Sequence, residues 1–326
     1  MVSAQPFDGK EDVKHMKNIK HILICGAGMM GKNIGYVFAS NPDFQVGLYD
    51  LYPTDVEAGI RTNTKQLLDK GVITEQELSD RLSRISFTTD MDSDLVKNAD
   101  FVIEAVFEDM KIKRETFAKL EARCRPDTIF CTNSSVMSPS EISAELKHRE
   151  RFVGTHFWNP GHLIPLVEVV KSDASSDEVA QTVMEVLSSV GKEPVLCKKD
   201  VPGFIANRMQ HARWREAISI VERGIADAAT VDKAVKYAFG LRLPQLGPME
   251  NADMVGTDLT YNIHDYILKD LEDSHEPSPL LKKLRDEGKI GFKTGEGFQT
   301  WTPGQIKASN EGLNDYLVDM LYGKKK

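Results

Sequence analysis

Two residues of this sequence, His156 and Glu168, have the types and the spacing expected of a proton-transfer pair. His156 ends one predicted strand and Glu168 lies within the next, and a Pro-Gly sequence at residues 160–161 reverses the chain between them. Imidazole titrates near neutral pH and suits a general base for a hydroxyl proton, while a carboxylate behind the ring fixes its tautomer. A histidine at a strand end is also often structural, so the residues alone leave both interpretations open.

A glycine fingerprint, G-x-G-x-x-G, is the second candidate site, and it consists of Gly26, Gly28 and Gly31 with Met29 and Met30 between the last two. It follows a predicted buried strand and opens a predicted helix. The first glycine permits a tight turn, the second lets the backbone approach a pyrophosphate, and the third lets the helix pack on the strand. Unpaired N–H groups and the macrodipole favour phosphate at such a helix N-terminus. The motif predicts a dinucleotide site, and the alternative is a plain glycine turn.

Asp50 indicates which dinucleotide is preferred. It lies 19 residues after Gly31, at the predicted end of the second strand. A carboxylate there accepts hydrogen bonds from the ribose hydroxyls and repels a 2′-phosphate. Because residues 51–53, Leu-Tyr-Pro, supply no arginine, the sequence favours NAD over NADP.

The elements that must position these residues alternate between strands and helices. Predicted strands cover residues 21–25, 45–49, 101–105, 129–132, 152–156 and 166–170, and residues 54–84 read as two antiparallel helices with a turn near residues 70–71. The fold class is therefore α/β, with a doubly wound sheet of the Rossmann type. After residues 200–203 the strand signal ends and long helices follow. We expect a flexible extension at residues 1–19, an NAD-binding domain at 20–201 and an all-α C-terminal domain, for substrate and dimerisation, at 202–326.

Composition excludes several other classes of protein. The chain has 326 residues and a net charge of −8, so the phosphates of a nucleic acid would be repelled on average. No run of 18 uncharged apolar residues occurs, which argues against a membrane span. The four cysteines lack C-x-x-C spacing and a histidine cluster, so we expect no metal site and reduced thiols in the cytoplasm.

Several motifs in register resemble those of the L-3-hydroxyacyl-CoA dehydrogenases. The similarity runs from about residue 22 to residue 298 and rests on the glycine fingerprint, V-I-E-A-V-F-E (102–108), N-S-S (133–135), H-F-W-N-P (156–160), L-V-E (166–168), D-V-P-G-F-I-A-N-R (200–208) and K-T-G-E-G-F (293–298). Several motifs in the same order are far more specific than any one of them.

The resemblance implies a role for each matching residue. His156 would be the catalytic base, Glu168 would orient it, and Ser135 and Asn207 would hold the substrate oxygen. Cofactor contacts similar to the family's would come from Asp50, Glu108, Lys113, Asn159 and Lys293. For the two lysines, a solvated surface position is the alternative. The implied reaction is the NAD-dependent oxidation of an L-3-hydroxyacyl-CoA to the 3-oxoacyl-CoA.

Some positions depart from the acyl-CoA enzymes and leave a second substrate class open. Residues 161–165 read Gly-His-Leu-Ile-Pro, and Arg242 replaces part of a small, proline-containing turn. These replacements are more similar to relatives that act on free hydroxy acids, such as carnitine dehydrogenase, the gulonate-oxidising lambda-crystallin group or a pyridine-carboxylate dehydrogenase. Arg242 could clamp a carboxylate there. A non-catalytic, crystallin-like protein is a further alternative, against which Ser135, His156, Glu168 and Asn207 argue together.

The helical hairpin favours the acyl-CoA substrate instead. Residues 67–82 are similar to a hairpin that 3-hydroxybutyryl-CoA dehydrogenases use beside the coenzyme A tail, where Lys65 could meet a phosphate.

The helical domain also carries more apolar surface than it can bury alone, for example at Ile218 and Ile225. We therefore expect a homodimer that acts on a small molecule, with neither nucleic acid nor membrane as a partner.

Overall fold

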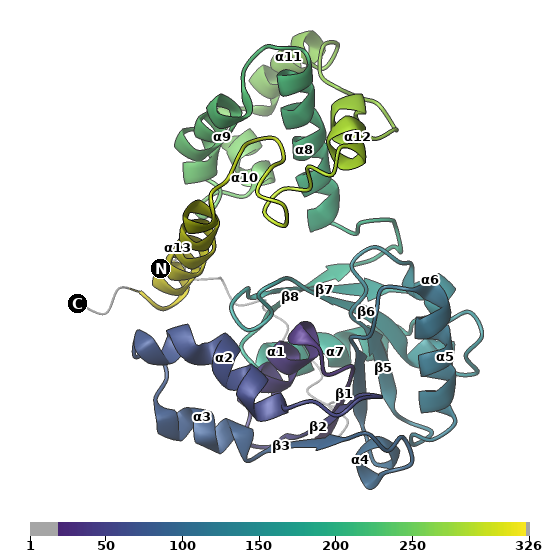
Figure 1. The fold of residues 1–326 in the computed structure, drawn as a ribbon. Helices are drawn as coiled ribbons and strands as arrows, with labels where there is room; N and C mark the ends of the chain where they lie inside the picture. The colour runs from purple at the N-terminus through teal and green to yellow at the C-terminus, as the bar shows by residue number, and fades with distance from the viewer. Residues whose placement is uncertain (1–18, 324–326) are drawn as a thin grey trace. The chain divides into compact units, whose positions relative to one another are not determined.

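The computed structural model describes residues 19–323, which form two compact units. The α/β unit comprises residues 19–206 and 313–323, and the helical unit comprises residues 207–312. Figure 1 shows every labelled strand in the first of these units. The expected N-terminal extension lies outside the described residues except for Ile19, and the domain boundary expected near residue 201 stays a prediction.

Eight strands form one sheet in the order β3-β2-β1-β4-β5-β6-β7-β8, and all neighbours pair parallel except β6 and β7. The strands are His21–Cys25 (β1), Gln45–Tyr49 (β2), Ile85–Thr88 (β3), Phe101–Glu104 (β4), Ile129–Thr132 (β5), Phe152–Phe157 (β6), Leu166–Lys171 (β7) and Glu193–Cys197 (β8). The strand order changes direction between β1 and β4, the position where such sheets bind ligands. The structure confirms the predicted doubly wound α/β class.

Helices cover both faces of the sheet, so the inner strands are apolar on both sides. Side chains alternate along β1: Ile22 and Ile24 lie in one core cluster, and Leu23 and Cys25 in the other. The first cluster includes residues of α1 (Met29–Phe38), α2 (Val56–Asp69), α3 (Glu75–Leu82) and α7 (Asp177–Ser189). The second includes residues of α4 (Asp94–Lys97), α5 (Met110–Glu121) and α6 (Pro139–Ile142).

The strands β3 and β8, which form the two edges of the sheet, are absent from the sequence-based prediction. β3 has four residues, none of them fully buried, and β8 has a single buried residue, Cys197. Such short segments lack a strong apolar pattern, and pairing with β2 or β7 decides their conformation. The predicted interruption of the helical hairpin is confirmed, because α2 ends at Asp69 and α3 begins at Glu75.

The helical unit is built from α8 (Ala206–Glu222), α9 (Ala228–Tyr237), α10 (Pro248–Val255), α11 (Thr257–Ile267), α12 (Pro279–Asp286) and the first half of α13 (Pro303–Tyr322). The second half of α13 belongs to the α/β unit, where Val318 joins the larger core cluster. Among residues 19–323, no helix is both long enough and apolar enough to cross a membrane.

Candidate active site

His156 and Glu168 face each other across the antiparallel pair β6 and β7. His156 Nδ1 lies 2.8 Å from Glu168 Oε2, and both side chains are buried. Since a carboxylate can only accept, Nδ1 carries the hydrogen, and in the neutral ring the free lone pair is on Nε2. Two residues that are twelve apart in the chain thus form the geometry of a general base and its orienting acid.

A tight turn after β8 supplies two further donors to Glu168. The backbone N–H groups of Ile205 and Ala206 donate to Glu168 Oε1 at 2.8 and 2.9 Å. They point at the carboxylate because Gly203 and Phe204 both have positive φ angles, 74° and 50°. The left-handed conformation is unfavourable for a non-glycine residue, and the buried Phe204 ring, 5.8 Å from the imidazole, holds it in place.

The Glu168 carboxylate stays ionised in this environment. Burial acts to raise the pKa of Glu168, but hydrogen bonds from His156 and from the N–H groups of Ala206 and Ile205 hold it below its usual value. A fourth donor, Trp158 Nε1, lies 3.3 Å from Oε2. The turn donors and Trp158 were not among the site residues inferred from sequence, because donation from a backbone or an indole leaves no motif of its own.

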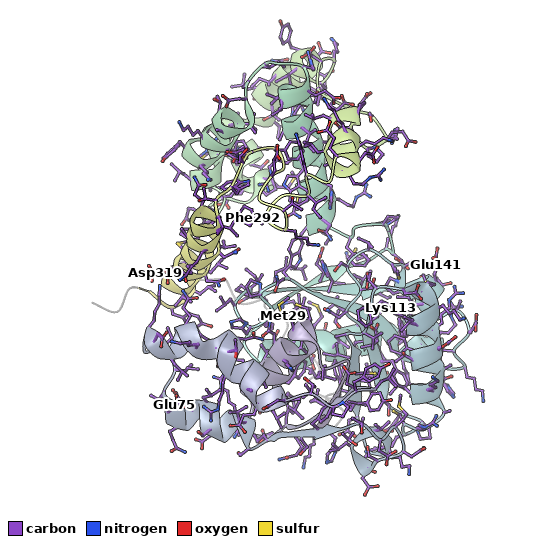
Figure 2. The ribbon with its side chains drawn as sticks, in the orientation of Figure 1. Met29, Glu75, Lys113, Glu141, Phe292 and Asp319 are labelled. Carbon is purple, nitrogen blue, oxygen red and sulfur yellow. The ribbon has the colours of Figure 1, made fainter. Side chains whose placement is uncertain are left out.

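A second polar cluster surrounds Lys113 of α5, which is labelled in Figure 2. Lys113 Nζ contacts Glu104 Oε1 at 2.7 Å and Glu108 Oε2 at 3.1 Å, and the lysine is only 1% exposed. Glu104 also accepts hydrogen bonds from Thr132 Oγ1 at 2.7 Å and from the Val106 N–H at 2.8 Å. Lys113 is therefore a buried residue, and the alternative of a solvated surface lysine is wrong for it.

Glu108 connects this cluster to the loop that carries Ser135. It accepts hydrogen bonds from Ser134 Oγ and from the Ser135 N–H, the latter at 3.0 Å. Burial acts to raise the pKa of Glu108, but the Ser134 hydrogen bond and the charge of Lys113 hold it below its usual value. Glu104 was not among the site residues inferred from sequence, although a single acidic residue in an apolar strand is a usable signal.

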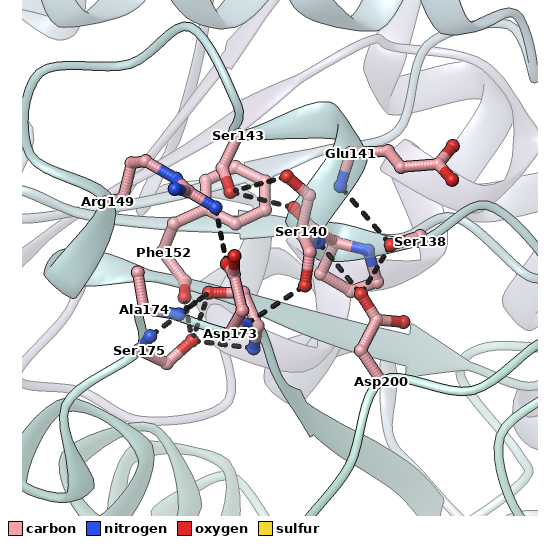
Figure 3. Close-up of polar contacts among 12 residues, drawn as sticks. Ser138, Ser140, Glu141, Ser143, Arg149, Phe152, Asp173, Ala174, Ser175 and Asp200 are labelled. Carbon is pink, nitrogen blue, oxygen red and sulfur yellow. Dashed lines mark hydrogen bonds and ion pairs between the residues drawn. The ribbon is translucent and has the colours of Figure 1, made fainter.

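The loop after β5 is also tied to the segment that follows β8 (Figure 3). Asp200 accepts a hydrogen bond from Ser138 Oγ and another, at 2.9 Å, from the Ser140 N–H. Ser138 Oγ in turn caps the first turn of α6 at the Glu141 N–H. One carboxylate thus links the loop that carries Ser135 with the turn that holds Glu168.

The glycine loop has the features that a dinucleotide requires. Gly26 has a φ of 107°, and a Cβ on Gly31 would lie 1.8 Å from Gly26 O, so neither position accepts a side chain. Gly28 precedes α1, has open space where its Cβ would be, and leaves the helix N-terminus without a side-chain cap. Asp50 Oδ2 accepts the Ala27 N–H at 2.8 Å, which fixes its carboxylate beside the loop. The residues present therefore fit NAD.

The other candidate residues are more exposed or lie in the helical unit. Met29 and Asn159 are exposed, whereas Met30 packs against the core. Ser135 has an exposed side chain. Asn207, Arg242 and Lys293 belong to the helical unit, in which Asn207 is buried and the other two are exposed.

Lys65, the candidate phosphate contact, is exposed and pairs with Asp69 at 2.5 Å. Among the described residues, no group of three or more His, Cys, Asp or Glu side chains could hold a metal ion.

Two family models match the chain in sequence order. The model described as 3-hydroxyacyl-CoA dehydrogenase, NAD binding domain, matches residues 21–201, and the model described as 3-hydroxyacyl-CoA dehydrogenase, C-terminal domain, matches residues 203–301. α13 begins after the second match ends.

Curated relatives carry two kinds of name. The chain is 33% identical over 292 residues to 5-formyl-3-hydroxy-2-methylpyridine 4-carboxylate 5-dehydrogenase of Mesorhizobium japonicum, which covers 89% of this chain and 93% of that protein. It is 37% identical over 284 residues to a probable 3-hydroxybutyryl-CoA dehydrogenase of Bacillus subtilis, which covers 86% of this chain and 96% of that protein.

Solved structures show the same two kinds of relative. A crystal structure of a 5-formyl-3-hydroxy-2-methylpyridine 4-carboxylic acid 5-dehydrogenase, described as an NAD⁺-dependent dismutase, matches with a TM-score of 0.85 and 32% identity over 94% of this chain and all of that chain. The (S)-3-hydroxybutyryl-CoA dehydrogenase of Ralstonia eutropha matches with a TM-score of 0.73 and 28% identity over 87% of this chain and 99% of that chain.

Proposed function

The chain belongs to the 3-hydroxyacyl-CoA dehydrogenase family, and from this premise we propose that it catalyses the NAD-dependent oxidation of a secondary alcohol with His156 as the base. The observation that carries the proposal is the buried hydrogen bond between His156 Nδ1 and Glu168 Oε2, 2.8 Å long. It leaves the opposite ring nitrogen, Nε2, as a proton acceptor of fixed tautomer and orientation.

Each of these residues would have its own role in the reaction. His156 Nε2 takes the hydroxyl proton, and the ionised Glu168 stabilises the imidazolium that results. Ser135 and Asn207 hold the substrate oxygen in line with the base. Bound NAD would supply the hydride acceptor for the carbon that bears the hydroxyl group. In the reverse direction, protonated His156 returns its proton to the ketone oxygen.

We assign the cofactor contacts on the same basis. Gly26, Gly28 and Gly31 let the pyrophosphate approach the N-terminus of α1, and Asp50 accepts the ribose hydroxyls. The remaining proposed contacts are Met29, Met30, Glu108, Lys113, Asn159 and Lys293. For Lys113, its burial between Glu104 and Glu108 supports a fixed position rather than a mobile one.

Two substrate classes share this chemistry. The first is an L-3-hydroxyacyl-CoA, as the family's name and the Bacillus subtilis relative suggest. The second is a small free hydroxy carboxylate bound by Arg242. It is supported by the TM-score of 0.85 to the pyridine-carboxylate dehydrogenase, and by the Gly-His-Leu-Ile-Pro sequence at residues 161–165.

Charge pairing on the helical hairpin also supports the second class. Lys65 is paired with Asp69, and Lys70 is paired with Asp315 and Asp319 of α13 at 2.8 and 3.1 Å. A coenzyme A phosphate would have to compete with these carboxylates for either lysine. We therefore favour the free hydroxy carboxylate as the substrate.

A substrate panel decides between the classes. The purified enzyme is given NAD with 3-hydroxybutyryl-CoA or with free acids that have a secondary hydroxyl group, such as carnitine and gulonate, and NADH absorbance is followed. Arg242→Ala should lower kcat/KM on free acids at least about tenfold, since a bidentate ion pair is lost. Arg285→Ala, an exposed arginine of the same unit paired with Asp286, is the matched control. Preferential turnover of the thioester, unaffected by Arg242→Ala, would assign the enzyme to the first class.

We further propose that the protein is a homodimer. The helical unit exposes large apolar side chains, with Tyr237, Met249, Tyr261 and Tyr266 each more than 70% exposed. Exposed large apolar side chains in this number favour a surface that packs against a partner, and a second copy is the commonest one. Sedimentation velocity should give about twice the chain mass, and Tyr261→Glu should shift the protein toward the monomer. The cytoplasmic location stays a prediction from the cysteines.

A further inference from the structure

Glu168 Oε2 accepts hydrogen bonds from two side chains of the same strand region. His156 Nδ1 lies 2.8 Å away and Trp158 Nε1 lies 3.3 Å away. The two donors are two residues apart at the end of β6, and their ring centroids are 5.2 Å apart. The indole N–H and the imidazole N–H therefore share one carboxylate oxygen.

Sharing an acceptor has a direct effect on base strength. Each N–H that donates to a carboxylate oxygen stabilises the negative charge of the carboxylate. The carboxylate then stabilises a neighbouring cation less strongly. Imidazolium is stabilised by the Oε2 of Glu168, so a second donor to that oxygen makes the imidazole a weaker base. Removal of the indole N–H should strengthen it.

The other titratable groups near the imidazole ring do not provide another means of setting the base strength of His156. In the described structure, β7 contributes Glu168 itself, and the turn after β8 contributes the apolar Phe204 ring and two backbone N–H groups. On β8, burial raises the pKa of the Cys197 thiol, which stays neutral. Asp200 is bonded to Ser138 and Ser140, and the Glu104–Lys113 ion pair lies two strands away on β4 and α5.

We propose that Trp158 is a positioning residue that sets the base strength of His156 through the oxygen of Glu168 that they share. The inference rests on the proposed function of His156 as the base. Trp158 occupies the variable position of the H-F-x-N-P motif, and a side chain that fills the same space without an N–H would leave Oε2 to the imidazole alone. The chain would thus use this position to adjust the pH range of its reaction.

The test is Trp158→Phe, which keeps an aromatic ring beside His156 and deletes the N–H. The titration of His156 is followed by nitrogen-15 NMR in the free enzyme, with His156→Gln to assign the signal. Its midpoint should move upward by about half a unit to one unit, the size expected for loss of a long hydrogen bond to a charged group. The acid limb of kcat/KM against pH should move by the same amount, a loss of roughly three- to tenfold at pH values below the midpoint.

A matched control is present in the same chain. The Trp214 and His211 ring centroids lie 5.0 Å apart in an edge-on pair, on the exposed surface of α8. Trp214→Phe should leave the His156 titration and the pH profile unchanged. If Trp158→Phe disturbs folding, replacement of Trp158 by benzothienylalanine removes only the N–H and keeps the shape of the indole.

The outcomes separate the two proposals. A His156 titration that does not move in Trp158→Phe or in the benzothienylalanine protein would overturn the role of Trp158, whatever the substrate. A titration that moves while the pH profile stays in place would support the role of Trp158 and would remove His156 as the base. If the His156 titration and the pH profile both move, the result would support the role of Trp158 and the role of His156 as the base.

Discussion

Glu104 and Lys113 form an ion pair 2.7 Å long in which the lysine is 1% exposed and the glutamate fully buried. Glu104 ends β4 and Lys113 lies one helical turn into α5, so the pair joins the sheet to the helix that follows it. Through Glu108, the same lysine is connected to the loop of Ser134 and Ser135. The position of the Ser135 loop is therefore connected, through Glu108 and Lys113, to Glu104 of β4.

Loss of one partner of this ion pair should lower the free energy of unfolding substantially. Glu104→Gln leaves Lys113 buried with a single acidic neighbour, and we expect the free energy of unfolding to fall by about 3 kcal/mol. Lys111→Met, on the same helix, removes an exposed pair with Glu115 at 3.9 Å and should change stability by less than about 1 kcal/mol. Urea denaturation measures both. Equal effects of the two substitutions would contradict the structural role of the pair.

His156→Ala should abolish most turnover while NAD binding remains. Removal of a general base costs roughly 10²- to 10⁴-fold in rate, and the glycine loop and Asp50 are not altered by the change. Turnover is measured by NADH absorbance and cofactor affinity by calorimetry. Unchanged turnover would exclude His156 from proton transfer, and loss of NAD affinity would mean that the residue acts on the fold instead.

Asp50→Ser should shift cofactor preference from NAD toward NADP. The substitution removes the carboxylate that we expect to accept the ribose hydroxyls and to repel a 2′-phosphate. The ratio of kcat/KM for the two cofactors should move toward NADP by about tenfold or more, which corresponds to ~1.4 kcal/mol. Asp43→Ser, an exposed aspartate before β2, is the control. An unchanged ratio would leave Asp50 with only its hydrogen bond to the Ala27 N–H.

Lys192 should make stability depend on pH above neutrality. It is buried, donates to the carbonyl oxygens of Gly161 and Ile164, and its pKa is lowered by burial to about 8. Between this value and the value of roughly 10.4 for an unfolded lysine, the unfolded state binds more protons than the folded state. This group therefore adds stability as pH rises from 8 to 10.4, by roughly 3 kcal/mol in total.

The measurement is a difference between two proteins. Urea denaturation of wild type and Lys192→Met at pH 7 to 10.5 should show the rise in wild type only. Lys198→Met, an exposed lysine just after β8, should keep the wild-type slope. Parallel curves for wild type and Lys192→Met would show that Lys192 is not a source of the pH dependence.

The sequence by itself determined the parts of this protein that depend on neighbours in the chain. The glycine fingerprint, the buried strands around it and Asp50 lie within 30 residues, so their pattern predicted the βαβ unit and the NAD preference. His156 and Glu168 were paired correctly because a short reversal joins their strands. Motif order over most of the chain was enough to identify the family.

Only the tertiary structure decided the contacts between segments that are distant in sequence. The edge strands β3 and β8 take their conformation from pairing, and the Ile205 and Ala206 N–H groups reach Glu168 from 37 and 38 residues away. For Lys113, a candidate cofactor contact, the sequence left a solvated surface position as the alternative, and only the fold placed Glu104 of β4 against it. Hydrogen bonds select partners by distance and direction, and these quantities exist only once the chain has folded.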